Sequence, residues 1–236
     1  MQQTGYLILN GGDAFSPKNK SADHIWLQLI RGHTRPRLVV LPTAMITNEQ
    51  KTADEVMRYF NYLGTFAEYK VITTPLLANT RTEYEVLDKV EAIVLTDGSP
   101  IDLVERLTDT HTLEALHRTI EERRGAVMAA GASAMAMGSA YWFANEWEPG
   151  LALAPHLAIL AHHNLVRMRL TPDRLLSNLP EGLTLLGIDQ TTTLISHPDG
   201  TYQVEGTGTV TVYWDVDQLD EYRAGQRFTL ETPDSA

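Results

Sequence analysis

Residues Ala126–Met135 read AVMAAGASAM and carry the strongest structural signal in this 236-residue chain. The segment Ala126–Ala130 is apolar throughout and predicts a strand buried on both faces, which is typical of a parallel sheet. It runs directly into Gly131-Ala132-Ser133, whose small residues let the strand and a following helix approach closely. A serine at such a turn stands clear of the sheet, where it can act as a nucleophile. The alternative is a packing turn in which Ser133 has no chemical role.

Apolar runs on both sides of this segment alternate with helical patterns, which predicts an α/β fold with a mostly parallel central sheet and helices on both faces. The helix after Thr47–Gln50, a capping-box pattern, is expected to bury residues spaced by three and four. After Leu183 the strands follow one another closely, which predicts antiparallel C-terminal strands that extend the sheet or form its edge. We expect one domain over residues 1–236. The further strands are expected at Tyr6–Leu9, Arg37–Leu41, Glu68–Ile72, Ala92–Leu95, Leu157–Ala161, Thr184–Ile188, Thr192–Ile195, Tyr202–Glu205 and Thr209–Trp214.

Composition and charge narrow the classes of function that this chain can have. Hydrophobic residues make up 43% of the chain and the net charge is −11, which disfavours nonspecific binding to nucleic acid or to anionic membranes. Because cysteine is absent, disulfides, thiolate zinc sites and cysteine nucleophiles are excluded. The uncharged run 125–144 is long enough to span a membrane, but its small residues favour a buried strand and helix. No secretory signal is visible, so a cytoplasmic location is expected.

A serine nucleophile needs a base, and two adjacent histidines offer one. His162 and His163 follow the apolar run Leu157–Ala161, so they stand at the end of another strand. Adjacent side chains on a strand point to opposite faces, so one of the two is expected to pack in the interior; a metal site is the alternative for the pair. The carboxylate that would orient the base is left open between Asp189, Glu146 and Glu148.

With these pieces in order, the chain resembles the S51 serine peptidases, the family of dipeptidase E and cyanophycinase, from Leu7 to about Trp214. The turn Ala130–Ala134 resembles the family's G-x-S-A-G nucleophile turn. Gly182–Asp189 resembles its G-L-T-L-L-G-I-D segment, and the glycines of Gly206–Val210 match its V-x-G-x-G-x-V ending. The order and spacing of these motifs together make the resemblance specific.

The same resemblance bears on the choice of histidine. Gly150–Pro155 resembles the G-L-G-L-x-P segment that leads to the catalytic histidine of the family, and counting forward from it gives His162. Counting back from Arg167 and Arg169, which resemble a family R-x-R, gives His163 instead. We prefer His162, because the forward count crosses the strand itself.

The resemblance implies a class I glutamine amidotransferase-like fold and a serine hydrolase that cleaves peptide or amide bonds in short, possibly aspartyl-containing, peptides. Ser133 would attack the carbonyl and His162 would take its proton. The N–H groups of Gly98, in a loop that is glycine-rich in the family, and of Ala134 would hold the oxyanion. Gln190 would be the third member, with Glu148 and Asp189 as alternatives for this role.

Two positions depart from the family pattern. Met135 stands where the family turn usually has glycine, so it either loosens the turn or fills part of the pocket. Gln190 stands where the cyanophycinase-like branch has a glutamate that orients the histidine, and an amide in that role lowers turnover by about 10⁴-fold in a serine-protease triad. These departures motivate a second hypothesis, a catalytically impaired pseudoenzyme or a protein that binds a small molecule or peptide on the same fold.

The expected partner is a small peptide substrate, and a homodimer is left open. Neither a cofactor nor a metal is expected, and nucleic acid and membranes are not expected as partners. An amidotransferase that passes ammonia onward is disfavoured, because it would need a cysteine nucleophile.

Overall fold

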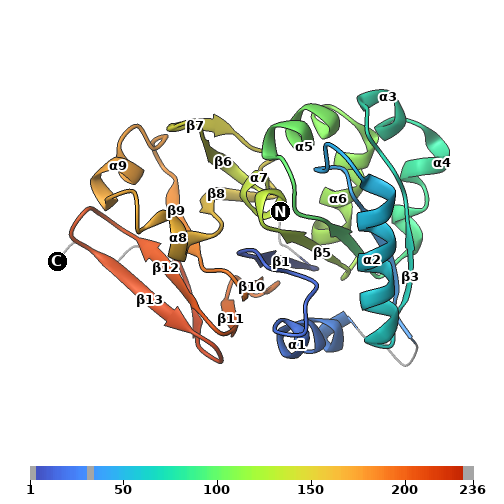
Figure 1. The fold of residues 1–236 in the computed structure, drawn as a ribbon, viewed down its shortest axis with the longest axis horizontal. Coiled ribbons are helices and arrows are strands. Elements are labelled where there is room, and N and C mark those ends of the chain that lie inside the picture. The colour runs from blue at the N-terminus through green and yellow to red at the C-terminus, as the bar shows by residue number, and fades with distance from the viewer. Residues whose placement is uncertain (1–3, 31–34, 231–236) are drawn as a thin grey trace.

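The computed structural model describes residues 4–30 and 35–230, whose strands form two sheets (Figure 1). The first sheet has eight strands in the order β14-β11-β10-β1-β5-β4-β2-β3. Its centre is parallel, because β1 pairs with β5, β5 with β4 and β4 with β2, and β10 begins an antiparallel part against β1. The strands are β1 (Tyr6–Asn10), β2 (Arg37–Leu41), β3 (Phe66–Tyr69), β4 (Ala92–Leu95), β5 (Ala126–Ala130), β10 (Thr192–Ser196), β11 (Tyr202–Gly206) and β14 (Arg227–Phe228).

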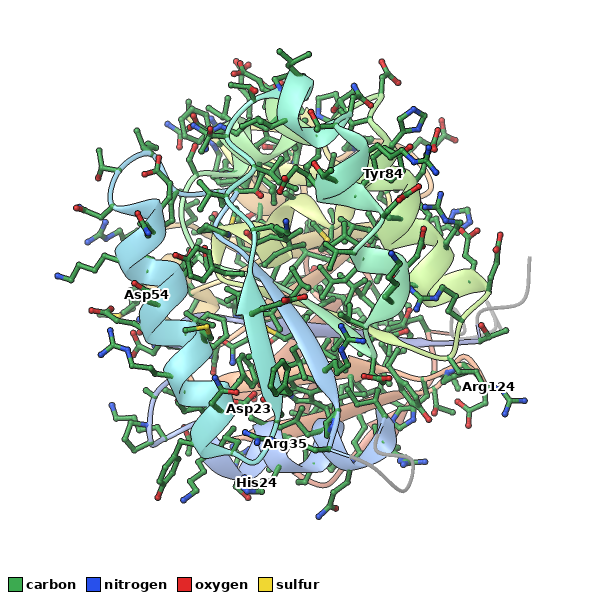
Figure 2. All side chains as sticks on the ribbon, turned by 90° about the vertical axis from the view of Figure 1, so that its right-hand side faces the viewer. Asp23, His24, Arg35, Asp54, Tyr84 and Arg124 are labelled. Atoms are coloured by element: carbon green, nitrogen blue, oxygen red, sulfur yellow. The ribbon has the colours of Figure 1, made fainter. Side chains whose placement is uncertain are left out.

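Helices cover both faces of the parallel part. Ile8 of β1 packs in a buried cluster with Trp26 and Phe60, which come from α1 and α2, whereas Leu9 packs on the opposite face with Leu116 of α6. Figure 2 shows the side that carries α2, where charged side chains such as Asp54 lie at the rim. The helices between these strands are α1 (Lys20–Ile30), α2 (Glu49–Tyr62), α3 (Pro75–Ala78), α4 (Arg81–Tyr84), the 3-10 turn η1 (Leu87–Lys89), α5 (Pro100–Leu107) and α6 (His111–Glu121).

A second sheet of six strands follows the order β13-β12-β9-β8-β6-β7. Its β6, β8 and β9 run parallel, and β7, β12 and β13 are antiparallel to their neighbours. These elements are β6 (Gly138–Phe143), β7 (Glu146–Pro149), β8 (Ala154–Leu160), β9 (Thr184–Ile188), β12 (Thr209–Tyr213) and β13 (Leu219–Arg223), together with the short helices α7 (Ala132–Ala136), α8 (His163–Val166) and α9 (Pro172–Leu176).

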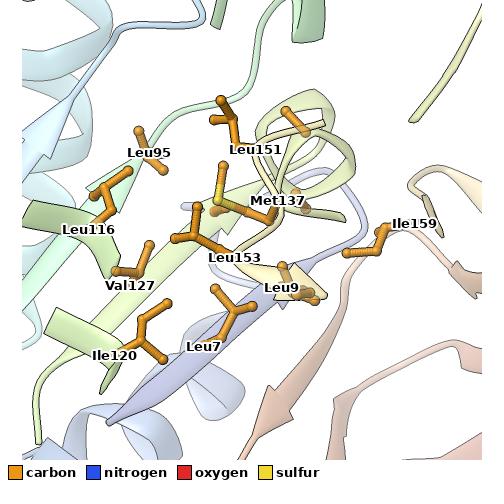
Figure 3. Packing of buried hydrophobic residues seen from close by; sticks show 14 of the residues in the cluster. Leu7, Leu9, Leu95, Leu116, Ile120, Val127, Met137, Leu151, Leu153 and Ile159 are labelled. Atoms are coloured by element: carbon orange, nitrogen blue, oxygen red, sulfur yellow. The ribbon is translucent and has the colours of Figure 1, made fainter. Parts of the chain in front are cut away.

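One hydrophobic cluster lies between the two sheets (Figure 3). Leu7 and Leu9 of β1 contribute to it from the first sheet, and Ile159 of β8 contributes from the second. Leu151 and Leu153, from the segment before β8, fill the space beside Met137. Residues of both sheets therefore share one hydrophobic core.

The α/β fold class with antiparallel C-terminal strands is confirmed, but its details differ in part from the prediction. The strands β9 and β12 belong to a second sheet and not to an extension of the first. The capping box is absent: α2 begins after Asn48, whose φ is 61° and whose side chain makes no capping hydrogen bond. The uncharged run 125–144 holds the expected buried strand and helix, β5 and α7, and continues into β6. Among the described residues, every helix is too short or too polar to cross a membrane.

Candidate active site

The carboxyl ends of three neighbouring strands, β1, β5 and β4, meet at one edge of the first sheet. The end of β8 reaches the same place, because the N–H of His162 donates to the carbonyl of Gly11 at 2.7 Å. An open pocket of about 590 Å³ lies there. Its titratable groups are Asp13, Asp97 and His162, and its larger apolar side chains are Phe15, Met45 and Met135.

The sharp turn after β5 falls at Gly131. This residue has φ 52° and ψ −118°, a conformation with positive φ that favours glycine. Its N–H donates to the carbonyl of Asn10 at 2.9 Å, which fixes the turn against β1. A Cβ atom at this position would lie 2.2 Å from Cγ and from both carboxylate oxygens of Asp97. While Asp97 stands where it does, residue 131 has no room for a side chain.

Ser133 lies two residues further on, inside α7. It is fully buried, and its hydroxyl donates to the carbonyl of Thr96 at 2.5 Å. Within the described part of the chain, no hydrogen bond joins Ser133 to a histidine, and Ser133 does not line the pocket. The prediction of an exposed hydroxyl was therefore wrong, because the strained turn precedes Ser133 and the first helical turn directs its side chain inward.

Asp97 occupies the position in front of the turn. Its Oδ1 accepts the N–H groups of Gly98 and of Ala132, each at 2.8 Å. Its Oδ2 lies 3.7 Å from Nε2 of His162. Gly98, one of the two predicted oxyanion donors, therefore points its N–H at the same oxygen as Ala132 does. Ala134, the other predicted donor, is fully buried within α7.

His162 presents its ring to the pocket with 34% of the side chain exposed. Its backbone, with φ 51°, caps α8, and its ring lies against the β1 loop. A Cβ on Gly12 would lie 2.2 Å from Cε1 of this ring. Gly12, with φ 120°, is therefore the residue that lets the imidazole lie beside Asp97.

His163 is fully buried, and its side chain packs against residues of the second sheet. Its Nδ1 lies 3.2 Å from Oδ1 of Asp189 and its Nε2 lies 2.8 Å from the Tyr213 hydroxyl. Asp189 also accepts both the N–H and the hydroxyl of Thr209. These groups form a buried network that joins α8, the end of β9 and β12, so Asp189 is engaged with His163 and not with His162.

The sequence model of peptidase family S51 matches residues 6–196, a span that contains the whole pocket edge described above. The chain belongs to peptidase family S51. Membership of S51 supports a peptidase-type hydrolase. A search of curated protein sequences finds no match to this chain.

Two solved structures share this S51 fold. A peptidase from an acI-B1 actinobacterium is similar with a TM-score of 0.84 at 18% identity, over 97% of this chain and 98% of the other. A peptidase E candidate from Listeria monocytogenes EGD-e gives a TM-score of 0.62 at 13% identity, over 86% of this chain and 99% of the other. At such identities the likeness establishes the fold and leaves the chemistry to the site itself.

Among the described residues, none of the other candidates for the expected S51 triad forms a hydrogen bond or ion pair with the His162 side chain. Gln190 exchanges hydrogen bonds with Asn164, donating its N–H to Oδ1 at 2.9 Å and accepting from Nδ2 at 3.3 Å. Glu148, on β7, lines a different pocket, and Glu146 is exposed at the start of the same strand. Met135 lines the site pocket, so its bulk fills part of that space. The group that faces His162 is Asp97.

The pair of Asp97 and His162 is electrostatically coupled. Partial burial opposes ionisation of Asp97, but the His162 ring and the N–H groups of Ala132 and Gly98 outweigh it and lower the pKa of this carboxyl. Asp97 in turn raises the pKa of His162, against the effect of partial burial, and Asp13 adds to the rise. Both shifts favour the pair of carboxylate and imidazolium.

Sequence reasoning missed Asp97 and Gly131 as site residues, and it missed the buried Asn10 behind them. Asn10 accepts the N–H of Gly12 through Oδ1 and donates through Nδ2 to Asn19 and Thr193. The available signal was position: each of these residues stands at or just past the carboxyl end of a parallel strand, where sites of open α/β sheets gather.

Proposed function

We propose that this S51 chain binds a short peptide or a related amine in the pocket of Asp97 and His162 without forming an acyl-enzyme on serine. The observation that carries the proposal is the burial of Ser133 together with its hydrogen bond to the Thr96 carbonyl. A nucleophile must reach both the substrate and a base, and a fully enclosed hydroxyl bound to a carbonyl reaches neither.

The chemistry of the pocket supports a ligand with a positive charge. Asp13 and Asp97 line it, and His162, which is paired with Asp97, is its basic side chain; neither lysine nor arginine lines it among the described residues. Asp13 is therefore the carboxylate left to meet a cationic group. Phe15, Met45 and Met135 add apolar surface. A free peptide amino terminus next to an apolar side chain fits these groups, because a charge-assisted hydrogen bond contributes about 1.5–3 kcal/mol. An aspartyl side chain would meet the Asp13 carboxylate and an imidazole already paired with Asp97, so the expectation of aspartyl substrates gains no support here.

The second candidate is the serine hydrolase expected from the family, with Ser133 as nucleophile, His162 as base and Gln190 behind it. Membership of S51 favours it. It would require α7 to rearrange so that Ser133 leaves Thr96 and enters the pocket. The backbone N–H groups of Gly98 and Ala132 would then have to release Asp97 to hold an oxyanion.

A fluorophosphonate probe separates the two candidates. We expect no adduct on the wild-type chain, while a known serine hydrolase treated in parallel is labelled. Ser133→Ala should lower the free energy of unfolding by about 1 kcal/mol through the lost hydrogen bond. Labelling of the wild type that disappears in Ser133→Ala would establish the serine hydrolase instead, and Gln190→Glu would then be expected to raise its rate.

Calorimetric titration tests the ligand class. We expect leucylglycine to bind at least about tenfold more tightly than its N-acetylated form, which corresponds to 1.4 kcal/mol. Asp13→Asn should reduce that preference. Equal binding of the two peptides, or a preference for an N-acetylated aspartyl peptide, would contradict an amine-binding pocket.

A further inference from the structure

The turn after β5 has a feature that the proposed function does not use. Its positive φ and the two backbone N–H groups beside it both point to residue 131. In hydrolases with a nucleophile on a strand-to-helix turn, the nucleophile is the strained residue itself, and the next residue supplies one oxyanion N–H while another loop supplies the second. In this chain the strained residue is Gly131. The next residue is Ala132, and its N–H converges with that of Gly98 on a single oxygen, each at 2.8 Å.

We infer that position 131 is the nucleophile position of this chain, left without a side chain, and that Asp97 is an internal occupant of the reaction space in front of it. The Oδ1 atom of Asp97 takes the place of a substrate oxyanion between the two N–H groups. Its carboxyl group stands within 2.2 Å of where the first side-chain atom of residue 131 would be.

Three observations make this occupancy specific. Asp97 is held by both N–H donors at once, so it is not a freely rotating surface carboxylate. His162 faces its other oxygen at 3.7 Å, which is where the base of a hydroxyl at position 131 would have to lie. In its present position the Asp97 carboxylate also excludes any residue at 131 that carries a Cβ atom. The inference rests on the turn and not on which ligand the pocket takes, so it stands or falls separately from the proposed function.

The test introduces a hydroxyl at position 131 with Gly131→Ser and removes the carboxylate that occupies its space with Asp97→Gly. Wild type, Asp97→Gly, Gly131→Ser and the double variant are each treated with a fluorophosphonate. In the double variant, the introduced hydroxyl oxygen attacks phosphorus: an O–P bond forms, the P–F bond breaks, fluoride leaves and the hydroxyl proton passes to His162. The N–H groups of Gly98 and Ala132 hold the phosphoryl oxygen.

We expect an adduct in the double variant only, mapped by peptide mass spectrometry to position 131. Adding His162→Ala should slow its formation by about 10²-fold or more, the usual contribution of a general base. A folded double variant that stays unlabelled, an adduct at Ser133, or equal labelling of Gly131→Ser with and without Asp97 would overturn the inference.

Stability gives a second measurement that needs no chemistry. Gly131→Ala should lower the melting temperature strongly in the wild-type background and much less in the Asp97→Gly background, because the clash is then removed. Gly182→Ala is the matched control: it has φ 80° and nothing within 4 Å of its added Cβ, so its loss should not depend on residue 97. Folding of Gly131→Ala only with Asp97→Gly would support the inference, and equal losses in both backgrounds would refute it.

Discussion

Asp97 controls the ionisation of the residue that faces it. It is the largest cause of the raised pKa of His162, so Asp97→Asn should bring that pKa down. Titration of the imidazole proton signals by NMR measures the change. Asp13→Asn should cause a smaller fall, because Asp13 acts only through charge at a distance. The signal of His197, whose lowered pKa follows from burial and from Arg227, should not move; a His162 pKa unchanged in Asp97→Asn would contradict the coupling.

The same two shifts set a pH window for the stability that this pair supplies. Because the pKa of His162 is higher in the folded state than in the unfolded chain, where it is 6.5, His162 stabilises the fold fully below pH 6.5. This stabilisation is lost as the pH rises through the pKa of the folded state. Because the pKa of Asp97 is lower in the folded state than the unfolded value of 3.8, Asp97 stabilises the fold above pH 3.8, and this stabilisation is lost as the pH falls through the pKa of the folded state. The pair therefore stabilises the fold most between about pH 4 and pH 6.5, and the stabilisation declines as the pH rises further through the raised pKa of His162.

Gly12 positions the His162 ring through the absence of a side chain. Gly12→Ala combines a positive φ of 120° with a Cβ placed 2.2 Å from Cε1 of His162. We expect a loss of about 1–3 kcal/mol in the free energy of unfolding and a displaced imidazole. Urea denaturation measures the first effect, and the NMR signal of His162 measures the second. Gly200→Ala, at φ 82° with open space around its Cβ, should leave the His162 signal unchanged.

Between elements, a buried carboxylate ties α1 to α2. Asp23 accepts hydrogen bonds from Trp26 at 2.8 Å and from the Tyr59 hydroxyl at 2.6 Å, and it lies near the end of α2 in Figure 2. Burial raises its pKa to about 6 from 3.8, although both hydrogen bonds act in the opposite direction. The folded state therefore favours the protonated form, which is the reverse of the usual case for an aspartate.

The sign of the resulting pH dependence follows from that shift. Because the folded state holds the proton more tightly, the free energy of unfolding should fall as the pH rises from about 4 to about 6. The difference between Asp23→Asn and wild type should grow by about 3 kcal/mol over this window, since the shift is roughly 2 pKa units. Urea denaturation from pH 4 to pH 7 measures it. Tyr59→Phe removes a donor and should move the window upward; a difference that is flat with pH would contradict the shift.

The elements themselves were largely predictable, because their signals are local. The bounds of β2, β4, β5 and β9 agree with the apolar runs that predicted them. Their partners were not predictable: an apolar run such as that of β9 suits either sheet, and only contacts with distant parts of the chain decide between them. The helix α1 was missed altogether, although it supplies Trp26 to the core.

The sequence predicted which loops form the site, but not which residues in those loops contact one another. The sequence pointed to the segments around Gly98, Gly131 and His162, and these do meet at one pocket edge. The strained φ does have a signature in residue type, because Gly131 is the only glycine in Gly131-Ala132-Ser133 and a positive φ favours glycine. The prediction followed the serine of the family motif and placed the turn at Ser133 instead. The contact between Asp97 and the turn joins residues 35 apart, which local pattern does not reveal.

For the whole molecule, the shared core predicts that the two sheets unfold together. Leu9 and Ile159 lie in one buried cluster although they belong to different sheets (Figure 3). Hydrogen exchange followed by mass spectrometry across a urea titration should give one midpoint for peptides from β4 and from β9. Two separate midpoints would mean that the chain is built from two units, against the expectation of a single domain over residues 1–236.

The space shared by residues 97 and 131 also limits which side chains can stand together there. With the Asp97 carboxylate in its present position, residue 131 cannot carry a Cβ atom. A larger residue at 131 would force that carboxylate to turn away and to give up the N–H groups of Gly98 and Ala132. The position that Asp97 holds therefore depends on glycine at 131.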